Sequence, residues 1–201
     1  MGMDNNFKKN FFLVLILLAS SVSVSYAGDT VMDCDPEPTD MSIAYGEFMT
    51  GGNCAIGSGG DVDLFRFNGS VGELVLLSLG DGTNNSLENP CFEVRDPANQ
   101  IVVPNGCASS NNKRVVEFLL PSSGSYLILV REDSNNSVPY GLSLDRLVPP
   151  TVSSDTIPCY GCMIASDISA LGDLDPYLFS ASAGDQILIT LTDGSGRVIR
   201  I

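Results

Sequence analysis

Two aspartates, Asp61 and Asp63, lie two residues apart at the start of an apolar run, and the same spacing recurs at Asp173 and Asp175. In an extended strand alternate side chains point to the same side, so the two carboxylates of each pair face one way. Calcium prefers oxygen ligands, and each pair is therefore a candidate calcium site. Acidic residues of the preceding segment could add ligands: Asp33, Asp35, Glu37 and Asp40. The alternative is that the aspartates only accept hydrogen bonds from loop amides.

The composition excludes several kinds of catalytic site. The chain has no histidine, which excludes Ser-His and Cys-His arrangements and most zinc sites. Its Asp-Gly sequences, Asp81-Gly82 and Asp193-Gly194, are typical of hairpin turns. Two well-placed acids would suffice for glycoside hydrolysis, but no group of pocket-forming residues accompanies such a pair here. We therefore expect a protein that is not an enzyme and that binds no cofactor except calcium.

All six cysteines lie beyond residue 27. In an exported protein an even number of cysteines predicts disulfides, although the sequence alone does not fix their pairing. We expect Cys91 to pair with Cys107, because these residues flank two apolar runs that are joined by a turn at 96–97. Cys34 with Cys54 is the next expected pair.

The remaining two cysteines, Cys159 and Cys162, have the spacing of a redox motif. A redox site of this kind needs its first cysteine at the start of a helix, and no helix is predicted here. We expect a local disulfide between them, or pairing with cysteines outside this chain.

The first 27 residues have the features of a secretory signal. Lys8 and Lys9 precede an apolar run at 11–19 that is short for a membrane span, and small residues at 25–27 provide a cleavage site. An uncleaved N-terminal anchor is the alternative. Cleavage leaves 8 basic against 23 acidic residues, a charge that repels nucleic acids and anionic lipids. We expect a secreted or periplasmic protein that binds no nucleic acid and does not insert into a membrane after cleavage.

A block of 23 residues occurs twice, 112 residues apart. Residues 60–82 and 172–194 align without a gap and are identical at ten positions, and most differences keep the chemical type, as between Val75 and Ile187. Self-similarity at a fixed spacing indicates a modular architecture. We expect one complete module and a truncated second copy.

Short apolar runs, separated by Gly, Asn, Asp, Ser and Pro, extend from 43 to 147 without a helical period. In the run at 63–68, Asp63, Phe65 and Phe67 share one face, which should be the core face. Residues 126–130 are apolar throughout, which suits a central strand covered on both sides. The pattern predicts an all-β protein built as an antiparallel β-sandwich.

Changes in composition divide the chain into five parts. Acidic residues and prolines before the first run indicate a leader, and consecutive prolines after the last run indicate an extended spacer. The expected parts are a signal peptide at 1–27, an acidic leader or linker at 28–42, a complete module at 43–148, a proline-rich linker at 149–155 and the truncated second copy at 156–201.

An ordered set of short motifs runs through the first module. The motifs are Tyr45-Gly46-Glu47, Gly60 to Phe67, Gly72-Glu73, Pro90 to Pro97, Leu120 to Tyr126 and Tyr140 to Leu144. In this order they resemble the bacterial pre-peptidase C-terminal domain family, over residues 41–147 and the front of the second copy. The resemblance implies a jelly-roll-like β-sandwich without catalytic activity, of the kind found beside exported proteases or in tandem in extracellular proteins. Relatives in clostridial collagenases bind calcium and collagen.

These observations predict an exported, non-catalytic β-sandwich protein that serves adhesion, spacing or substrate targeting outside the cell. One alternative is a carbohydrate- or protein-binding module with a defined ligand site. Another is the N-terminal fragment of a longer secreted hydrolase or multi-module surface protein. In each case the partners would be extracellular proteins or polysaccharides.

Overall fold

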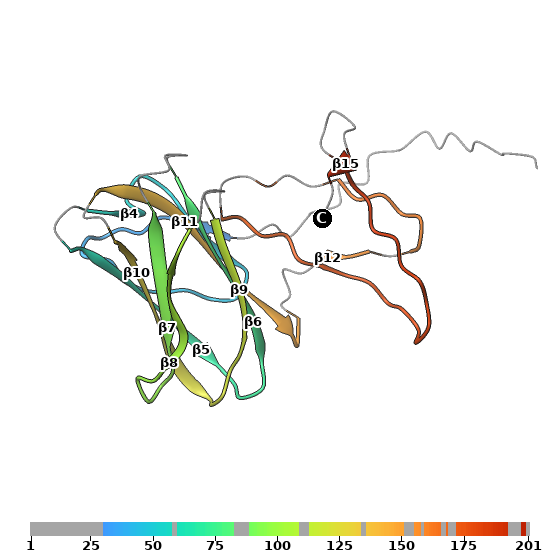
Figure 1. The fold of residues 1–201 in the computed structure, drawn as a ribbon, viewed down its shortest axis with the longest axis horizontal. Helices are drawn as coiled ribbons and strands as arrows, with labels where there is room; N and C mark the ends of the chain where they lie inside the picture. The colour runs from blue at the N-terminus through green and yellow to red at the C-terminus, as the bar shows by residue number, and fades with distance from the viewer. Residues whose placement is uncertain are drawn as a thin grey trace, which may run out of the picture.

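The computed structural model describes residues 30–57, 60–82, 89–108, 113–133, 136–150, 155–157, 159–165, 168, 172–192 and 198–199. The regular elements of these residues are all β-strands, which form a sandwich of two sheets and two small two-stranded sheets beside it (Figure 1). The all-β sandwich predicted from the sequence is confirmed. In the described part of the chain, no helix has the length and apolar character of a membrane span. The predicted signal peptide lies outside the described residues.

The first sheet has the strand order β1-β3-β11-β6-β9, with β4 pairing with β11. The pairing is antiparallel except between β1 and β3, which are parallel. The bounds are β1 (Thr30–Met32), β3 (Glu47–Met49), β4 (Ala55–Ile56), β6 (Leu74–Asp81), β9 (Lys113–Leu119) and β11 (Val138–Val148).

The second sheet has the order β2-β5-β10-β7-β8. Here β2 pairs with β5 in parallel, and the other pairs are antiparallel. Both sheets are therefore mixed, whereas the sequence pattern predicted purely antiparallel ones. The bounds are β2 (Asp40–Ser42), β5 (Val62–Gly69), β7 (Pro90–Arg95), β8 (Ile101–Cys107) and β10 (Gly124–Glu132).

The core lies between the two sheets and follows the alternation of the strands. In β5 the side chains of Asp63, Phe65 and Phe67 are buried, as their shared face predicted. In β10, which lies between β5 and β7, Ile128 faces the core while Leu127 on the opposite face is half-buried. This central strand is therefore fully covered on one side only. Each large apolar side chain buried in this way contributes about 1.5–3 kcal/mol.

The segment predicted as a leader, 28–42, differs from that expectation because part of it belongs to the sandwich. Its strands β1 and β2 each add to the edge of one sheet. Cys34 and Thr39, between these strands, are buried. Three-residue strands are too short to show alternation, and their parallel partners are set by distant segments, so the local sequence did not reveal them.

Three disulfides are present, in the pairings that the sequence favoured: Cys34–Cys54, Cys91–Cys107 and Cys159–Cys162. Cys91 and Cys107 lie directly opposite each other in β7 and β8. Disulfides form and persist in oxidising compartments, so their presence agrees with a location outside the cytoplasm.

Beside the sandwich, β12 (Asp155–Thr156) pairs in parallel with β13 (Tyr177–Leu178), and β14 (Leu191–Thr192) pairs with β15 (Val198–Ile199). Tyr177 corresponds to Phe65 in the sequence repeat, so the parallel pair β12-β13 matches the pair β2-β5. The turn at Gly172 lies against the first sheet, since a Cβ there would be 2.5 Å from the Gly141 carbonyl oxygen. Residues 151–154 of the predicted linker lie outside the described residues.

An ion pair between the buried Glu73 and the half-buried Arg146 connects the β5-β6 turn to β11. Glu73 Oε1 accepts a hydrogen bond from Arg146 Nη1 at 2.7 Å, and Oε2 accepts from the Tyr45 hydroxyl at 2.9 Å and the Ser70 amide at 3.0 Å. Burial by itself raises the pKa of Glu73, but these hydrogen bonds outweigh it, so the pKa lies below its ordinary value. Glu73 therefore connects three segments of the chain: the β5-β6 turn, the loop that contains Tyr45, and β11.

Replacing this carboxylate should cost more stability than replacing a carboxylate at the surface. We expect Glu73→Ala to lower the free energy of unfolding by about 2–4 kcal/mol, because Arg146 and Tyr45 lose their partner. The matched control is Asp40→Ala, which removes the exposed ion pair with Arg66 and should cost less than about 1 kcal/mol. Urea denaturation measures the free energy of unfolding of both variants. Equal decreases in the two would show that the contacts of Glu73 do not stabilise the fold more than a surface ion pair does.

Candidate metal centre

Asp63 is a carboxylate inside the sandwich. Its side chain is fully buried, on the inner face of β5. Its Oδ2 accepts a hydrogen bond of 2.5 Å from the hydroxyl of Tyr140 in β11, whereas its Oδ1 is buried without a hydrogen-bond partner. A buried charged oxygen without a partner carries a desolvation cost that a bound cation would offset.

Two further carboxylates lie beside Asp63. Glu37 belongs to the connection between β1 and β2, and Asp61 immediately precedes β5. One oxygen from each of the three side chains lies within 4.8 Å of the other two. We call Glu37, Asp61 and Asp63 the acidic cluster. It joins two segments of the chain that are separated by β2, β3 and β4.

Contacts around the cluster hold these segments in place. The Gly57 amide donates a hydrogen bond to Asp61 Oδ2 at 2.7 Å, and the Thr39 amide donates to Glu37 Oε2 at 3.1 Å. The Thr39 hydroxyl donates to the Cys34 carbonyl at 3.0 Å, and Cys34 is fixed by its disulfide. The chain is thus anchored on both sides of Glu37.

The electrostatics of the cluster favour a cation. Burial, together with the weaker effect of the charges of Glu37 and Asp61, raises the pKa of Asp63 to about 6, against the hydrogen bond from Tyr140 and the nearby Thr39 hydroxyl, which both lower it. Burial and the nearby Asp63 carboxylate also raise the pKa of Tyr140, so its hydroxyl stays protonated and donates. Like charges held this close are stable only when a proton or a metal ion partly neutralises them.

The structure brings together Asp61 and Asp63, as their spacing predicted. Glu37 is the leader residue that joins them. Asp33, which the sequence also offered as a ligand, instead accepts hydrogen bonds from the amide and side chain of Asn53. Asp40 forms an ion pair with Arg66. The sequence alone does not distinguish among these acids, because which of them reaches Asp61 and Asp63 depends on the path of the segment 28–42 in the fold.

The second aspartate pair has a different environment. Asp173 and Asp175 are half-buried and belong to no group of three close ligand atoms within the described part of the chain. A calcium site at this pair stays a prediction.

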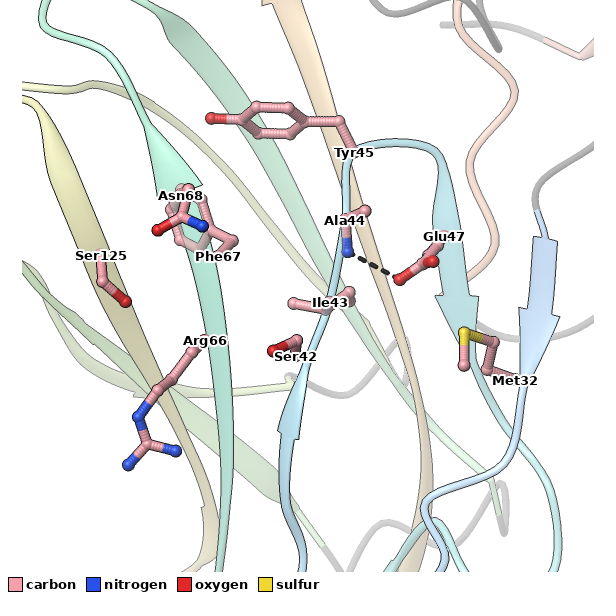
Figure 2. A pocket seen from close by; sticks show the side chains of 10 residues that line it. All are labelled: Met32, Ser42, Ile43, Ala44, Tyr45, Glu47, Arg66, Phe67, Asn68 and Ser125. Carbon is pink, nitrogen blue, oxygen red and sulfur yellow. Dashed lines mark hydrogen bonds between the residues drawn. The ribbon is translucent and has the colours of Figure 1, made fainter.

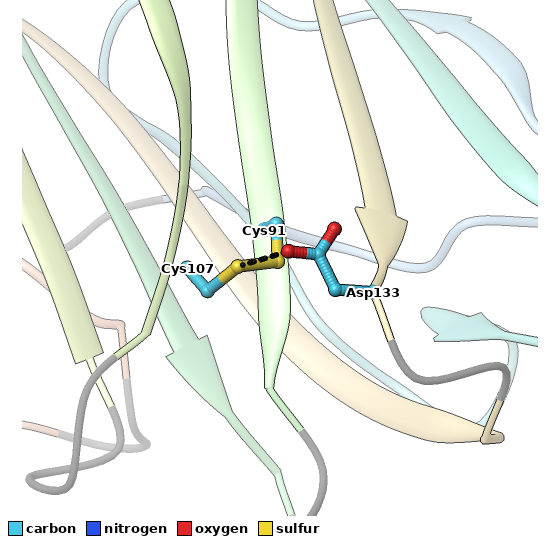
Figure 3. A group of neighbouring side chains, drawn as sticks. All are labelled: Cys91, Cys107 and Asp133. Carbon is cyan, nitrogen blue, oxygen red and sulfur yellow. Dashed lines mark hydrogen bonds between the residues drawn. A yellow bond between two sulfur atoms is a disulfide. The ribbon is translucent and has the colours of Figure 1, made fainter.

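A second cluster of metal-ligand side chains is formed by Cys91, Cys107 and Asp133 (Figure 3). Asp133 Oδ2 lies 3.1 Å from Cys107 Sγ. The two sulfurs are bonded to each other, and a metal ligand must be a thiolate. This arrangement is therefore a structural disulfide with a carboxylate beside it.

A groove of about 570 Å³ lies where the edges of the two sheets meet (Figure 2). Polar side chains of Arg66, Asn68 and Ser125 line one side of it, and Met32 and Glu47 line the other (Figure 2). Glu47 Oε2 accepts a hydrogen bond from the Ala44 amide at 2.6 Å, which fixes the floor between the two sides.

No protein-family model matches the chain, and no curated protein matches it. Among solved structures, the pre-peptidase C-terminal domain of collagenase from Bacillus anthracis is similar, with 18% identity and a TM-score of 0.42 over 55% of this chain and 99% of that one. Two structures of PliG, a periplasmic inhibitor of g-type lysozyme, are also similar. PliG from Aeromonas hydrophila has 18% identity and a TM-score of 0.39 over 59% of this chain and 98% of that one. PliG from Salmonella Typhimurium has 18% identity and a TM-score of 0.37 over 53% of this chain and 96% of that one. These comparisons do not assign the chain to a family.

The raised pKa of Asp63 predicts a particular pH dependence in the absence of metal. A carboxyl whose pKa rises from 3.8 to about 6 on folding contributes stability below its unfolded value, and this contribution is lost as the pH rises through about 6. With a chelator present, we expect the melting temperature of the wild type to fall relative to that of Asp63→Asn between about pH 4 and pH 7. If the melting temperatures of the wild type and of Asp63→Asn change in parallel with pH over this range, Asp63 does not titrate in this way.

Proposed function

We propose that this chain is an exported, non-catalytic β-sandwich protein of the pre-peptidase C-terminal type, whose first module binds calcium in the acidic cluster. The observation that carries the proposal is the buried Asp63 Oδ1, which has no hydrogen-bond partner and lies beside two further carboxylates. The role that fits such a module is adhesion, spacing or substrate targeting outside the cell.

The residue types of the cluster favour calcium over other metals. Calcium takes about six to eight oxygen ligands in flexible geometry, so Glu37, Asp61 and Asp63 would supply part of the set and backbone carbonyls and water the rest. Zinc prefers nitrogen and sulfur ligands, whereas the chain has no histidine and its cysteines form disulfides. Magnesium requires a more regular geometry and retains most of its water.

A bound calcium ion would connect the β1-β2 segment to the start of β5. This segment enters the sandwich through two three-residue strands, which provide few backbone hydrogen bonds. A cation shared by Glu37 on this segment and Asp61 and Asp63 at the start of β5 would stiffen the entry to the module. In a protein of repeated modules, a stiff entry fixes the direction in which one module follows another.

The proposed relation to the pre-peptidase C-terminal domain family is supported by the contacts of residues that belong to the resembling motifs. Asp63 and Tyr140 connect the two sheets, and Glu73 connects the β5-β6 turn to β11. The division into a first module and a second copy is supported by the parallel pairs β2-β5 and β12-β13, which occupy matching positions in the repeat. Export is supported by the three disulfides.

Calcium binding should raise the melting temperature of the full chain. We expect a rise of about 5 °C or more in millimolar calcium, reversed by a chelator, because an ion that binds only the folded state stabilises it. Asp63→Asn should abolish the rise.

The matched control is Asp133→Asn, which changes an acidic residue beside the Cys91–Cys107 disulfide and should keep the full calcium response. A rise that survives in Asp63→Asn, or the lack of any rise in the wild type, would overturn the calcium proposal.

A second candidate function is the binding of an extracellular protein or polysaccharide in the groove. The exposed polar side chains of Arg66 and Asn68, next to Ser125, provide hydrogen-bond donors and acceptors of the kind that sugars and peptides use. We expect Asn68→Ala to weaken saturable binding of such a ligand about tenfold without changing the melting temperature. Unchanged affinity in this variant, measured by calorimetry with oligosaccharides and matrix peptides, would exclude the groove.

A further inference from the structure

The three disulfides differ in their exposure to solvent. In the first module Cys34, Cys54 and Cys91 are fully buried, so each of its two disulfides has at least one cysteine in the interior. In the second copy Cys159 and Cys162 are both exposed. A thiol must reach a sulfur atom in order to exchange with it, and exposed disulfides are therefore the reactive ones. Cys159–Cys162 is the most accessible of the three.

The length of the loop that each disulfide closes favours the same bond. The paired cysteines are 20 and 16 residues apart in the first module, and three residues apart in the second copy. Closing a longer loop removes more freedom from the unfolded chain, so folding and such a disulfide stabilise each other more strongly. The fold therefore protects Cys159–Cys162 least against reduction.

Tyr160, between the two cysteines, connects this disulfide to another turn of the second copy. Its hydroxyl donates a hydrogen bond to the Ser180 carbonyl oxygen at 2.7 Å and lies 3.4 Å from Asp185 Oδ2. The disulfide closes the turn at 159–162, where the Cys162 amide donates to the Cys159 carbonyl oxygen. Because both ends of this turn are fixed, Tyr160 is held in its contacts.

The turn that Tyr160 reaches repeats a turn of the first module. The Ser182 amide donates a hydrogen bond to Asp185 Oδ2 at 2.7 Å. In the first module the Ser70 amide donates to Glu73 Oε2 at 3.0 Å, and the two pairs occupy matching positions in the repeated block. In both turns a carboxylate fixes an amide of the turn and lies beside a tyrosine hydroxyl.

The tyrosine comes from a different position in each copy. In the first module it is Tyr45, which is 28 residues before Glu73. In the second copy it is Tyr160, which is 25 residues before Asp185 and lies on the turn that the disulfide closes. The tyrosine contact of the second copy therefore depends on a bond that a thiol can open, whereas that of the first module does not.

We propose that the Cys159–Cys162 disulfide is a thiol-exchange site, and that its reduction releases Tyr160 from the 180–185 turn. The co-reactant is a dithiol. The segment 159–162 is a turn and no helix begins there, so the thiolate lacks the stabilisation that a helix N-terminus gives to redox catalysts. The site therefore responds to dithiols and does not catalyse exchange in other proteins.

The exchange proceeds in two steps. A thiolate of the dithiol attacks one sulfur of the Cys159–Cys162 bond, which forms a mixed disulfide and releases the other cysteine as a thiolate that takes up a proton. The second thiol of the co-reactant loses its proton and attacks the mixed disulfide, which releases the remaining cysteine. Two electrons and two protons pass from the dithiol to the two cysteines, and the dithiol becomes a disulfide.

The first test treats the full chain with increasing dithiothreitol in the absence of denaturant, alkylates the free thiols and maps them by mass spectrometry. We expect alkylation of Cys159 and Cys162 at dithiothreitol concentrations about tenfold below those that open the other two disulfides. The melting temperature of the first module should not change at these concentrations, because its disulfides stay closed.

The second test measures amide hydrogen exchange by NMR before and after this selective reduction. We expect exchange at 182–185 to become about threefold faster or more, while exchange at 70–73 stays the same. Tyr160→Phe, which keeps the disulfide, should give the fast exchange already in the oxidised protein and no further change on reduction. Reoxidation of the wild type should restore the slow exchange.

Two results would overturn the proposal. If a disulfide of the first module opens before Cys159–Cys162, or all three open together, the second copy does not contain the preferred exchange site. If Cys159–Cys162 opens first but exchange at 182–185 is unchanged, the disulfide does not hold Tyr160 against this turn.

Discussion

A buried hydrogen bond between Tyr140 and Asp63 connects the two sheets of the sandwich. Asp63 belongs to the second sheet and Tyr140 to the first, and both side chains lie in the interior. The bond uses one oxygen of the carboxylate and leaves the other beside Glu37 and Asp61. The same residue therefore helps to hold the sheets together and forms the centre of the candidate metal site.

Two buried carboxylates in this protein, Glu73 and Asp63, differ in their hydrogen bonding and have pKa values shifted in opposite directions. The difference distinguishes a carboxylate that stabilises the fold from one that is a candidate metal ligand. Glu73 receives hydrogen bonds on both oxygens, one of them from a guanidinium, and its pKa is lowered. Asp63 receives a hydrogen bond on one oxygen and has carboxylates for neighbours, and its pKa is raised. A satisfied buried charge stabilises the fold, whereas an unsatisfied one requires a proton or a cation. Position in the sequence does not reveal this difference; the set of hydrogen-bond donors does.

The sequence predicted those features that depend on local pattern. Alternation identified the buried face of β5, and the spacing around one turn identified the Cys91–Cys107 disulfide. Features that depend on distant segments were missed. The short strands β1 and β2 gain their structure from parallel partners, and the place of Glu37 in the cluster follows from that path. Arg114 likewise donates to the carbonyls of Phe92 and Gly106 across the sandwich edge, for which no short motif exists.

The two copies of the repeat show which structural properties a short identical sequence determines and which it does not. The aspartate pair and the apolar positions recur in both copies, yet the acidic cluster forms around the first pair and the apolar side chains are buried in the first copy. A short strand sequence determines which side chains share a face, because the alternation of a strand is local. Which side chains are buried, and which oxygens lie close together, depends on other segments of the chain. Glu37 completes the acidic cluster, and β10 and β11 pack beside β5 and β6 in the first copy. The block that occurs twice therefore has different surroundings in the two copies, and the segments that pack against it decide which of its side chains are buried.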